Sequence, residues 1–269
     1  LVPTLSAIEN IKLPMTLEQP DRVNDVWGSR TPYDRGANWD VRVDLALADG
    51  VEEGDVDTWV RSACVLCSNG CGCDIAVKDG RMVGIRGRAD DAVNRGRLGP
   101  KGLYASWQGM TGVDRLTTPL VRVGEDLVPA SWDEAMNRVV SRSRELLDEI
   151  GPLSHAFYTS GQLFLEEYYA LAVVGKAGVG TPHMDGNTRL CTATAASALK
   201  ESFGADGQPA CYDDLDECDA MSLFGHNMAA TQTVLWSRVL DRLAGPRPPR
   251  LVVVDPRDTP VARRADVHL

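Results

Sequence analysis

The sequence predicts an α/β protein in which a small β-rich domain precedes a parallel sheet with helices on both faces. Two observations lead to this prediction. Four cysteines fall within residues 64–73, directly before a β-hairpin signal, and beyond residue 150 short apolar runs alternate with helical segments. Such alternation is typical of parallel strands joined by helical crossovers. A length of 269 residues is enough for one large domain or two smaller ones.

Composition and charge narrow the functional class. Hydrophobic residues make up 43% and charged residues 25% of the chain, as in ordinary globular proteins. A net charge of −10 argues against a nucleic-acid partner, because such binding depends on Lys and Arg that neutralise phosphates. No apolar run is long enough to span a membrane. No leader is recognisable, so we expect a cytoplasmic protein, although a start at Leu1 rather than Met leaves a removed leader open.

The element signals divide the chain into three parts. Residues 1–57 show no sustained period and are interpreted as an N-terminal extension lying over the rest of the protein. Residues 58–118 form the small β-rich domain, with a hairpin predicted around Asp79-Gly80. Residues 119–269 form the α/β domain, which we expect to be incomplete. Its sheet should be Rossmann-like, with ligands at the carboxyl ends of the strands.

The α/β domain opens with a second hairpin turning at Gly124-Glu125. Ser131 and Glu134 then have the spacing of a capping box, which predicts a helix from Trp132 to about residue 149. Gly151-Pro152 ends that helix. The segments that follow are predicted as buried strands at 156–159, 220–224 and 251–254, and as helices at 164–176, 192–202 and 231–243.

The cysteine cluster is the most informative motif. Cys64-x2-Cys67-x3-Cys71 places three thiolates on a tight loop, where each can bind a different iron of a cluster. Zinc is the main rival, but its sites usually pair two separated Cys/His hairpins, and the chain has only four histidines. A disulfide framework is disfavoured because such frameworks belong to much shorter secreted chains.

The cysteine loop, the hairpin and the segment Arg97-Leu98-Gly99-Pro100-Lys101-Gly102 together resemble the opening of the prokaryotic molybdopterin oxidoreductases. That family includes assimilatory and periplasmic nitrate reductases and formate dehydrogenases. The resemblance implies a fourth cysteine ligand where this chain has Gly99. A 3Fe-4S cluster, a 4Fe-4S cluster with one non-cysteine ligand, and recruitment of Cys73 all remain open. Cys73 is more readily interpreted as a buried strand residue. Lys101 is expected as the electron relay between cluster and pterin.

A second motif surrounds Cys191. The sequence Asn187-Thr188-Arg189-Leu190-Cys191 resembles the nitrate reductase segment whose cysteine binds molybdenum, and Gln162 belongs to a matching upstream segment. We expect Cys191 to open a helix, whose dipole favours a thiolate. A soft thiolate suits molybdenum beside the pterin sulfurs. Cys191 is therefore the expected catalytic metal ligand, with Gln162 and Asn187 as cofactor-binding residues.

Two turns are expected to hold the cofactor's dinucleotide part. Gly225-His226-Asn227 lies between a predicted strand and a helix, where backbone amides can meet a pyrophosphate. Asp255-Pro256-Arg257 follows the next strand, with Thr259 close behind. The resemblance implies that these residues bind molybdopterin guanine dinucleotide, with Asp255 toward the nucleoside. There is no G-x-G-x-x-G and so no indication of a nicotinamide site.

The resemblance implies two-electron reduction of nitrate to nitrite by a molybdenum bis(molybdopterin guanine dinucleotide) cofactor fed through the iron–sulfur cluster. The expected partners are a small oxoanion substrate and a redox protein: a flavoprotein, a ferredoxin or a further iron–sulfur subunit. A formate dehydrogenase-type or other oxoanion oxidoreductase and a molybdenum-free electron-transfer subunit are the alternatives. Thr192 and Ala229–Thr233 depart from the nitrate reductase pattern, which leaves the substrate open.

Overall fold

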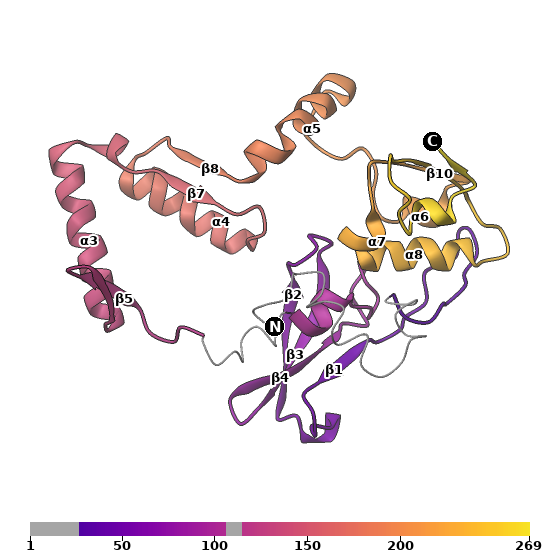
Figure 1. Cartoon of the computed structure of the whole chain (residues 1–269), viewed down its shortest axis with the longest axis horizontal. Helices are drawn as coiled ribbons and strands as arrows, with labels where there is room; N and C mark the ends of the chain where they lie inside the picture. The colour runs from indigo at the N-terminus through magenta and orange to yellow at the C-terminus, as the bar shows by residue number, and fades with distance from the viewer. Residues whose placement is uncertain (1–26, 106–114) are drawn as a thin grey trace. The chain divides into compact units, whose positions relative to one another are not determined.

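The computed structural model describes residues 27–105 and 115–269 (Figure 1). Residues 1–26 of the expected extension and residues 106–114 of the expected β-rich domain lie outside the described residues. The chain divides into two compact units. The described part of the first unit comprises residues 27–105 and 210–269, and that of the second comprises residues 115–209.

The first unit contains a four-stranded antiparallel sheet of order β1-β4-β3-β2. Its strands are β1 (Leu45–Leu47), β2 (Thr58–Cys64), β3 (Cys71–Lys78) and β4 (Arg81–Gly87). The predicted hairpin is confirmed as β3 and β4. Asp79 and Gly80 both have positive φ, 50° and 70°, which matches the right-handed twist of the strands they join.

The segment before residue 57 takes part in the fold of the first unit and does not only lie over it. β1 pairs with β4 as an edge strand, Leu45 opposite Arg86. Trp39 is completely buried, and Tyr33 is nearly so, in a core shared with Cys71 and Ile85. The sequence pattern did not predict this, because isolated aromatic residues in an irregular segment have no periodicity.

A three-stranded parallel sheet of order β11-β10-β9 completes the first unit (Figure 1). Its strands are β9 (Ala220–Phe224), β10 (Arg250–Val254) and β11 (Val267–His268), accompanied by α6 (Asp214–Glu217), α7 (Met228–Thr231) and α8 (Thr233–Leu243). α8 is buried from Thr233 to Arg242, and its apolar residues form one core with those of β10. β10 is buried at alternate residues, whereas β9 buries only Met221, so the expectation of a buried strand holds better for β10.

The second unit begins with the predicted second hairpin, β5 (Leu120–Val123) and β6 (Asp126–Pro129). α3 (Trp132–Glu149) follows with the predicted cap, since Ser131 Oγ accepts from the amide of Glu134 at 3.2 Å. The remaining elements are β7 (Phe157–Thr159), α4 (Leu165–Ala172), a π-helical segment Val173–Val179, β8 (Met184–Gly186) and α5 (Thr188–Phe203). β7 and β8 pair in parallel. None of the three residues of β7 is buried, contrary to the expectation.

The predicted class is confirmed: the protein is mixed α/β, with a β-rich N-terminal region followed by helices and parallel strands. Within the described residues the parallel strands form two sheets, of three and two strands, and not one continuous sheet. No helix in the described ranges is both long and apolar enough to cross a bilayer.

Candidate functional site

The first candidate site is the cysteine loop of the first unit. Cys64 ends β2 and Cys71 begins β3, and the two residues lie directly opposite each other in the register of the sheet. Cys67 lies in the turn between them. Ser68 and Gly70 both have positive φ, 53° and 79°, so the chain reverses sharply here. A β-hairpin thus presents three thiols from one short segment, although Cys64 and Cys71 belong to strands rather than to a loop.

The Cys71 thiol is buried, and those of Cys64 and Cys67 are partly buried, close enough for their charges to repel one another. Burial raises the pKa of Cys71, and the neighbouring Cys64 and Cys67 raise it further. Burial also raises the pKa of Cys64. Metal ligands must be thiolates, so these groups suit a cationic metal centre that offsets their desolvation and repulsion. Among the described residues no three such side chains converge closely enough to ligate a single ion. An iron–sulfur cluster is compatible with that spread because each thiolate binds a different iron.

The segment after the hairpin lies against Cys64. A Cβ added to Gly102 would lie 3.4 Å from Cys64 Sγ, so glycine leaves room beside this thiol. Lys101 lies in the π-helical turn Lys101–Ala105 and is half-buried. Its positive charge opposes the rise in the pKa of Cys64, which places Lys101 within electrostatic reach of the thiols. This position is compatible with the proposed relay role.

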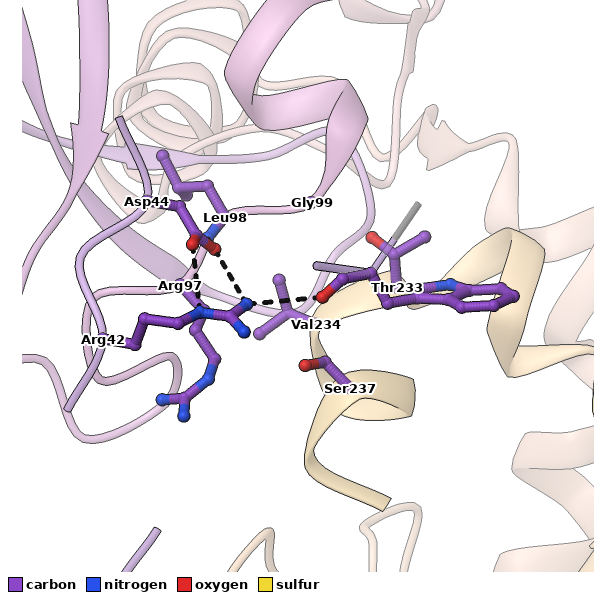
Figure 2. A pocket seen from close by; sticks show the side chains of 9 residues that line it. Arg42, Asp44, Arg97, Leu98, Gly99, Thr233, Val234 and Ser237 are labelled. Carbon is purple, nitrogen blue, oxygen red and sulfur yellow. Dashed lines mark hydrogen bonds and ion pairs between the residues drawn. The ribbon is translucent and has the colours of Figure 1, made fainter. Parts of the chain in front are cut away.

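Gly99, at the position where the resembling family has a fourth cysteine, lies tightly against α8 (Figure 2). A Cβ at this residue would lie 1.9 Å from Thr233 Oγ1. A small cavity of about 10 Å³, room for roughly one water molecule, lies beside it, lined also by Arg42, Leu98 and Ser237. The hydroxyls of Thr233 and Ser237 are buried and have no hydrogen-bond partner in the described part of the chain. Gly99 therefore fills a packing position that a larger side chain would overfill.

Cys73 lies in the interior of the sheet. It is buried between Ser62 of β2 and Gly87 of β4, and its side chain shares a face of β3 with Cys71. Burial and the nearby Cys64 raise its pKa to about 11. This position suits a small buried residue.

The carboxyl ends of β9 and β10 bring together the residues expected at the dinucleotide. Phe224 and Val254 are paired in the sheet, so Gly225 and Asp255 follow at the same edge. Gly225 has φ +59° with open space where a Cβ would be, and its amide donates to Val254 O at 2.8 Å. Asn227 Oδ1 is buried without a partner. A left-handed glycine beside an unpaired buried acceptor is compatible with a bound polar cofactor.

The residues after β10 form hydrogen bonds and an ion pair with one another. The Asp255 carboxylate is buried and accepts from the amide of Arg257 at 2.9 Å. Thr259 Oγ1 accepts from the amide of Ala262 at 3.1 Å. The Arg257 side chain is exposed, with Nε 3.7 Å from Asp255 Oδ1. The turn is thus held in shape by its own side chains, and the Arg257 guanidinium is available to a ligand.

The second unit repeats this arrangement at the carboxyl ends of β7 and β8. Thr159 and Gly186 are paired, and the residues after them are joined by hydrogen bonds. The amide of Gly161 donates to Asn187 Oδ1 at 2.8 Å, and the amide of Asn187 donates to Thr159 O at 3.0 Å. The structure therefore brings the Gln162 segment and the Asn187 segment to one sheet edge. Ligands in parallel α/β sheets bind at such edges.

Cys191 is placed differently from the expectation. α5 begins at Thr188, so Cys191 is its fourth residue and does not open it. The helix starts earlier because Asn187 already has helical φ and ψ and its side chain is held by Gly161. Cys191 is still in the first turn of the helix, and its side chain is exposed. Gln162, Asn187 and Cys191 belong to the second unit, and the other expected site residues to the first.

Two residues beside the cysteine loop escaped the sequence-based prediction. Asn69 is buried within the loop, and the hydroxyl of Tyr212 donates to its carbonyl oxygen at 3.2 Å. The only signal in the sequence was a polar residue between two ligand cysteines, next to a glycine that permits a reversal. Tyr212 is 143 residues away in sequence from Asn69, so no local pattern connects the two.

Comparison with protein families gives two matches that together span most of the chain. Residues 57–108 match the molybdopterin oxidoreductase Fe4S4 domain. Residues 115–269 match the molybdopterin oxidoreductase family itself. These matches support an iron–sulfur cluster and a molybdenum–molybdopterin cofactor, which is what the cysteine loop and the sheet edges accommodate.

Individual relatives are similar over the same region. A nitrate reductase of Symbiobacterium thermophilum is 36% identical over 212 residues, which is 79% of this chain and 28% of that protein. A periplasmic nitrate reductase of Desulfovibrio desulfuricans is 38% identical over 215 residues, again 79% and 28%. Among solved structures, acetylene hydratase from Pelobacter acetylenicus has a TM-score of 0.60 at 22% identity, covering 78% of this chain and 29% of that one. The chain thus spans less than a third of the length of these proteins.

Proposed function

The chain belongs to the molybdopterin oxidoreductase family, and on this basis we propose that the protein reduces nitrate to nitrite with electrons delivered through an iron–sulfur cluster. The observation that carries the proposal is the 36–38% identity to two nitrate reductases over 79% of the chain. The acetylene hydratase is only 22% identical to this chain, so its similarity supports the fold alone.

Each cofactor has a set of candidate residues. Cys64, Cys67 and Cys71 would ligate the cluster, and Cys191 the molybdenum. The candidate residues for the pterin dinucleotide are Gln162 and Asn187 in the second unit and, in the first, Lys101, Gly225, Asn227, Asp255, Arg257 and Thr259. When bound, the molybdenum cofactor supplies the two-electron chemistry by which nitrate, two protons and two electrons become nitrite and water.

The residues of the chain contribute position and charge. Cys191, exposed on the first turn of α5, would present its sulfur to the molybdenum. Lys101 supplies a positive charge beside Cys64, which favours electron arrival at the neighbouring cluster by stabilising the reduced, more negative form. The exposed guanidinium of Arg257 can donate hydrogen bonds to a phosphate or to a base carbonyl.

The electron donor and the location are part of the same proposal. We propose a small redox protein or subunit as donor and a cytoplasmic location; the Desulfovibrio relative carries the name of a periplasmic enzyme, which makes the periplasm the alternative. Fractionation of cells followed by activity staining separates the two. Activity confined to the periplasmic fraction overturns the cytoplasmic assignment.

The test uses the full-length protein. Oxidation of a dithionite-reduced viologen dye is followed with nitrate, and nitrite is measured in the same samples. Formate with an oxidised dye is the parallel assay, and molybdenum, tungsten and iron are determined per chain. Stoichiometric nitrite formation supports the proposal. Formate oxidation without nitrate reduction favours the formate dehydrogenase alternative, and iron without molybdenum or tungsten favours an electron-transfer subunit.

A further inference from the structure

The side-chain amide of Asn69 is buried and has no hydrogen-bond partner among the residues that the structure describes. Its residue is only 4% exposed, and neither Nδ2 nor Oδ1 makes a hydrogen bond. It lies in the turn between Cys67 and Cys71, two of the three candidate cluster ligands. A buried amide without hydrogen bonds is unfavourable because it has lost its bonds to water. Such a group in a native fold is expected to have a partner, here one that residues 27–105 and 115–269 do not supply.

The loop holds Asn69 inward by its backbone. Its two neighbours, Ser68 and Gly70, have positive φ and are exposed, so the turn directs Asn69 away from solvent. The hydroxyl of Tyr212 fixes the carbonyl of Asn69 at 3.2 Å. Tyr212 also lies within electrostatic reach of Cys71, whose charge contributes to a raised pKa of the phenol. The backbone of Asn69 is thus fixed, with its side chain buried, within the loop that carries the candidate ligands.

A second asparagine near the same loop shows the contrast. Asn94 is completely buried, and all of its hydrogen-bonding atoms have protein partners. Its Oδ1 accepts from the amide of Gly72, and its Nδ2 donates to the carbonyl oxygens of Gly72 and Arg97. The side-chain amide of Asn94 is therefore fully hydrogen-bonded within the fold, whereas that of Asn69 has no partner among the described residues.

We propose that the side-chain amide of Asn69 donates an N–H to sulfur of the iron–sulfur cluster held by Cys64, Cys67 and Cys71, and so acts as a positioning residue that raises the reduction potential of the cluster. A donor to cluster sulfur stabilises the reduced form, which carries one more negative charge. The inference rests on the cluster of the proposed function but not on nitrate as substrate.

The test is a potentiometric titration of the full-length protein, followed by electron paramagnetic resonance. Asn69→Leu replaces the amide by an apolar group of similar size, and its midpoint potential should be lower than that of the wild type. Asn69→Ser keeps a donor and should lie between the two. Leu66→Ala, in the same loop but without a side-chain donor, is the matched control and should match the wild type. Equal potentials in Asn69→Leu and wild type, at equal spin and iron content, overturn the inference and indicate a water partner.

A second measurement needs no variant. The wild-type protein is labelled with ¹⁵N in the side-chain amide of asparagine. Pulsed electron paramagnetic resonance of the reduced cluster should then show coupling to a nearby nitrogen. Asn94 donates elsewhere, so Asn69 is the expected source. Absence of this coupling overturns the inference even where Asn69→Leu fails to hold iron. Wild-type protein without iron contradicts the proposed function itself, which separates the two failures.

Discussion

The indole Nε1 of Trp39 donates a hydrogen bond to Asp241 Oδ2 at 2.9 Å, and both residues are completely buried. Asp241 lies on α8, and Trp39 lies in the irregular segment before β1. The same carboxylate accepts from the amide of Thr31 at 3.1 Å and lies 3.6 Å from Arg97 Nη2. The Arg97 guanidinium in turn lies 3.8 Å from the centre of the Trp39 ring. This buried network joins the N-terminal segment, α8 and the segment that leads to Lys101.

Asp241→Asn should therefore destabilise the first unit. It removes the negative charge but leaves Arg97 buried, and breaking a buried pair in this way typically costs about 3–5 kcal/mol. Urea unfolding followed by tryptophan fluorescence measures the loss, since Trp39 and Trp236 are both fully buried. Asp219→Asn is the control, because its pair with Arg35 is exposed and such pairs contribute roughly 0–1 kcal/mol. A loss no larger than that of the control would show that the network is dispensable.

Gly99→Cys should not restore a fourth cluster ligand without strain. Its Cβ would lie 1.9 Å from Thr233 Oγ1, and overpacking of this kind typically costs about 1–3 kcal/mol. The double variant with Thr233→Ala removes the clash and should recover most of the lost stability. Gly54→Cys is the control, since Gly54 has open space and no positive φ. Thermal unfolding gives the stability of Gly99→Cys, of the double variant and of Gly54→Cys. An unchanged melting temperature in Gly99→Cys would contradict the clash with Thr233.

Cys73 and Cys64 should behave differently when replaced by alanine. Cys64→Ala should lose iron, because it removes one of three thiols gathered at the hairpin. Cys73→Ala should keep its iron and lose only a little stability, as expected for a small buried residue in the interior of the sheet. The two variants are compared by their iron content per chain and by the electron paramagnetic resonance spectrum of the reduced protein. Iron lost from Cys73→Ala would instead make Cys73 the fourth ligand.

Local signals predicted the local elements well. Asp79-Gly80, Gly124-Glu125 and the Ser131 cap each specify a backbone conformation by themselves, and the structure has both hairpins and the helix at the predicted bounds. The alternation of strands and helices predicted the parallel strands of both units, although only β10 shows the expected burial.

What the sequence did not predict depends on contacts between distant residues. β1 is an edge strand of three residues, too short to show alternation, and it is fixed by its pairing with β4. The burial of Trp39 depends on Asp241, 202 residues further along the chain. The start of α5 was predicted too late because the side chain of Asn187 is held by Gly161, a bond across two strands. The unpartnered amide of Asn69 is likewise a property of the folded loop and not of its spacing.

Cys191→Ala provides the sharpest separation of the two metal centres. Cys191 is exposed on the first turn of α5, so its replacement should leave the melting temperature unchanged. It is not one of the three candidate cluster ligands, so the electron paramagnetic resonance spectrum of the reduced cluster should also be unchanged. Nitrate-dependent dye oxidation should fall by at least about 100-fold, because even the partners of a metal ligand change activity by roughly 10–100-fold.

Cys211→Ala is the matched control, since Cys211 is also exposed and both of its hydrogen bonds with Asp214 are made by backbone atoms of Cys211. It should retain wild-type activity. Activity retained in Cys191→Ala would remove this residue from the molybdenum site. A loss of the cluster spectrum together with activity would show that the replacement acts through the fold of the chain and not through the metal.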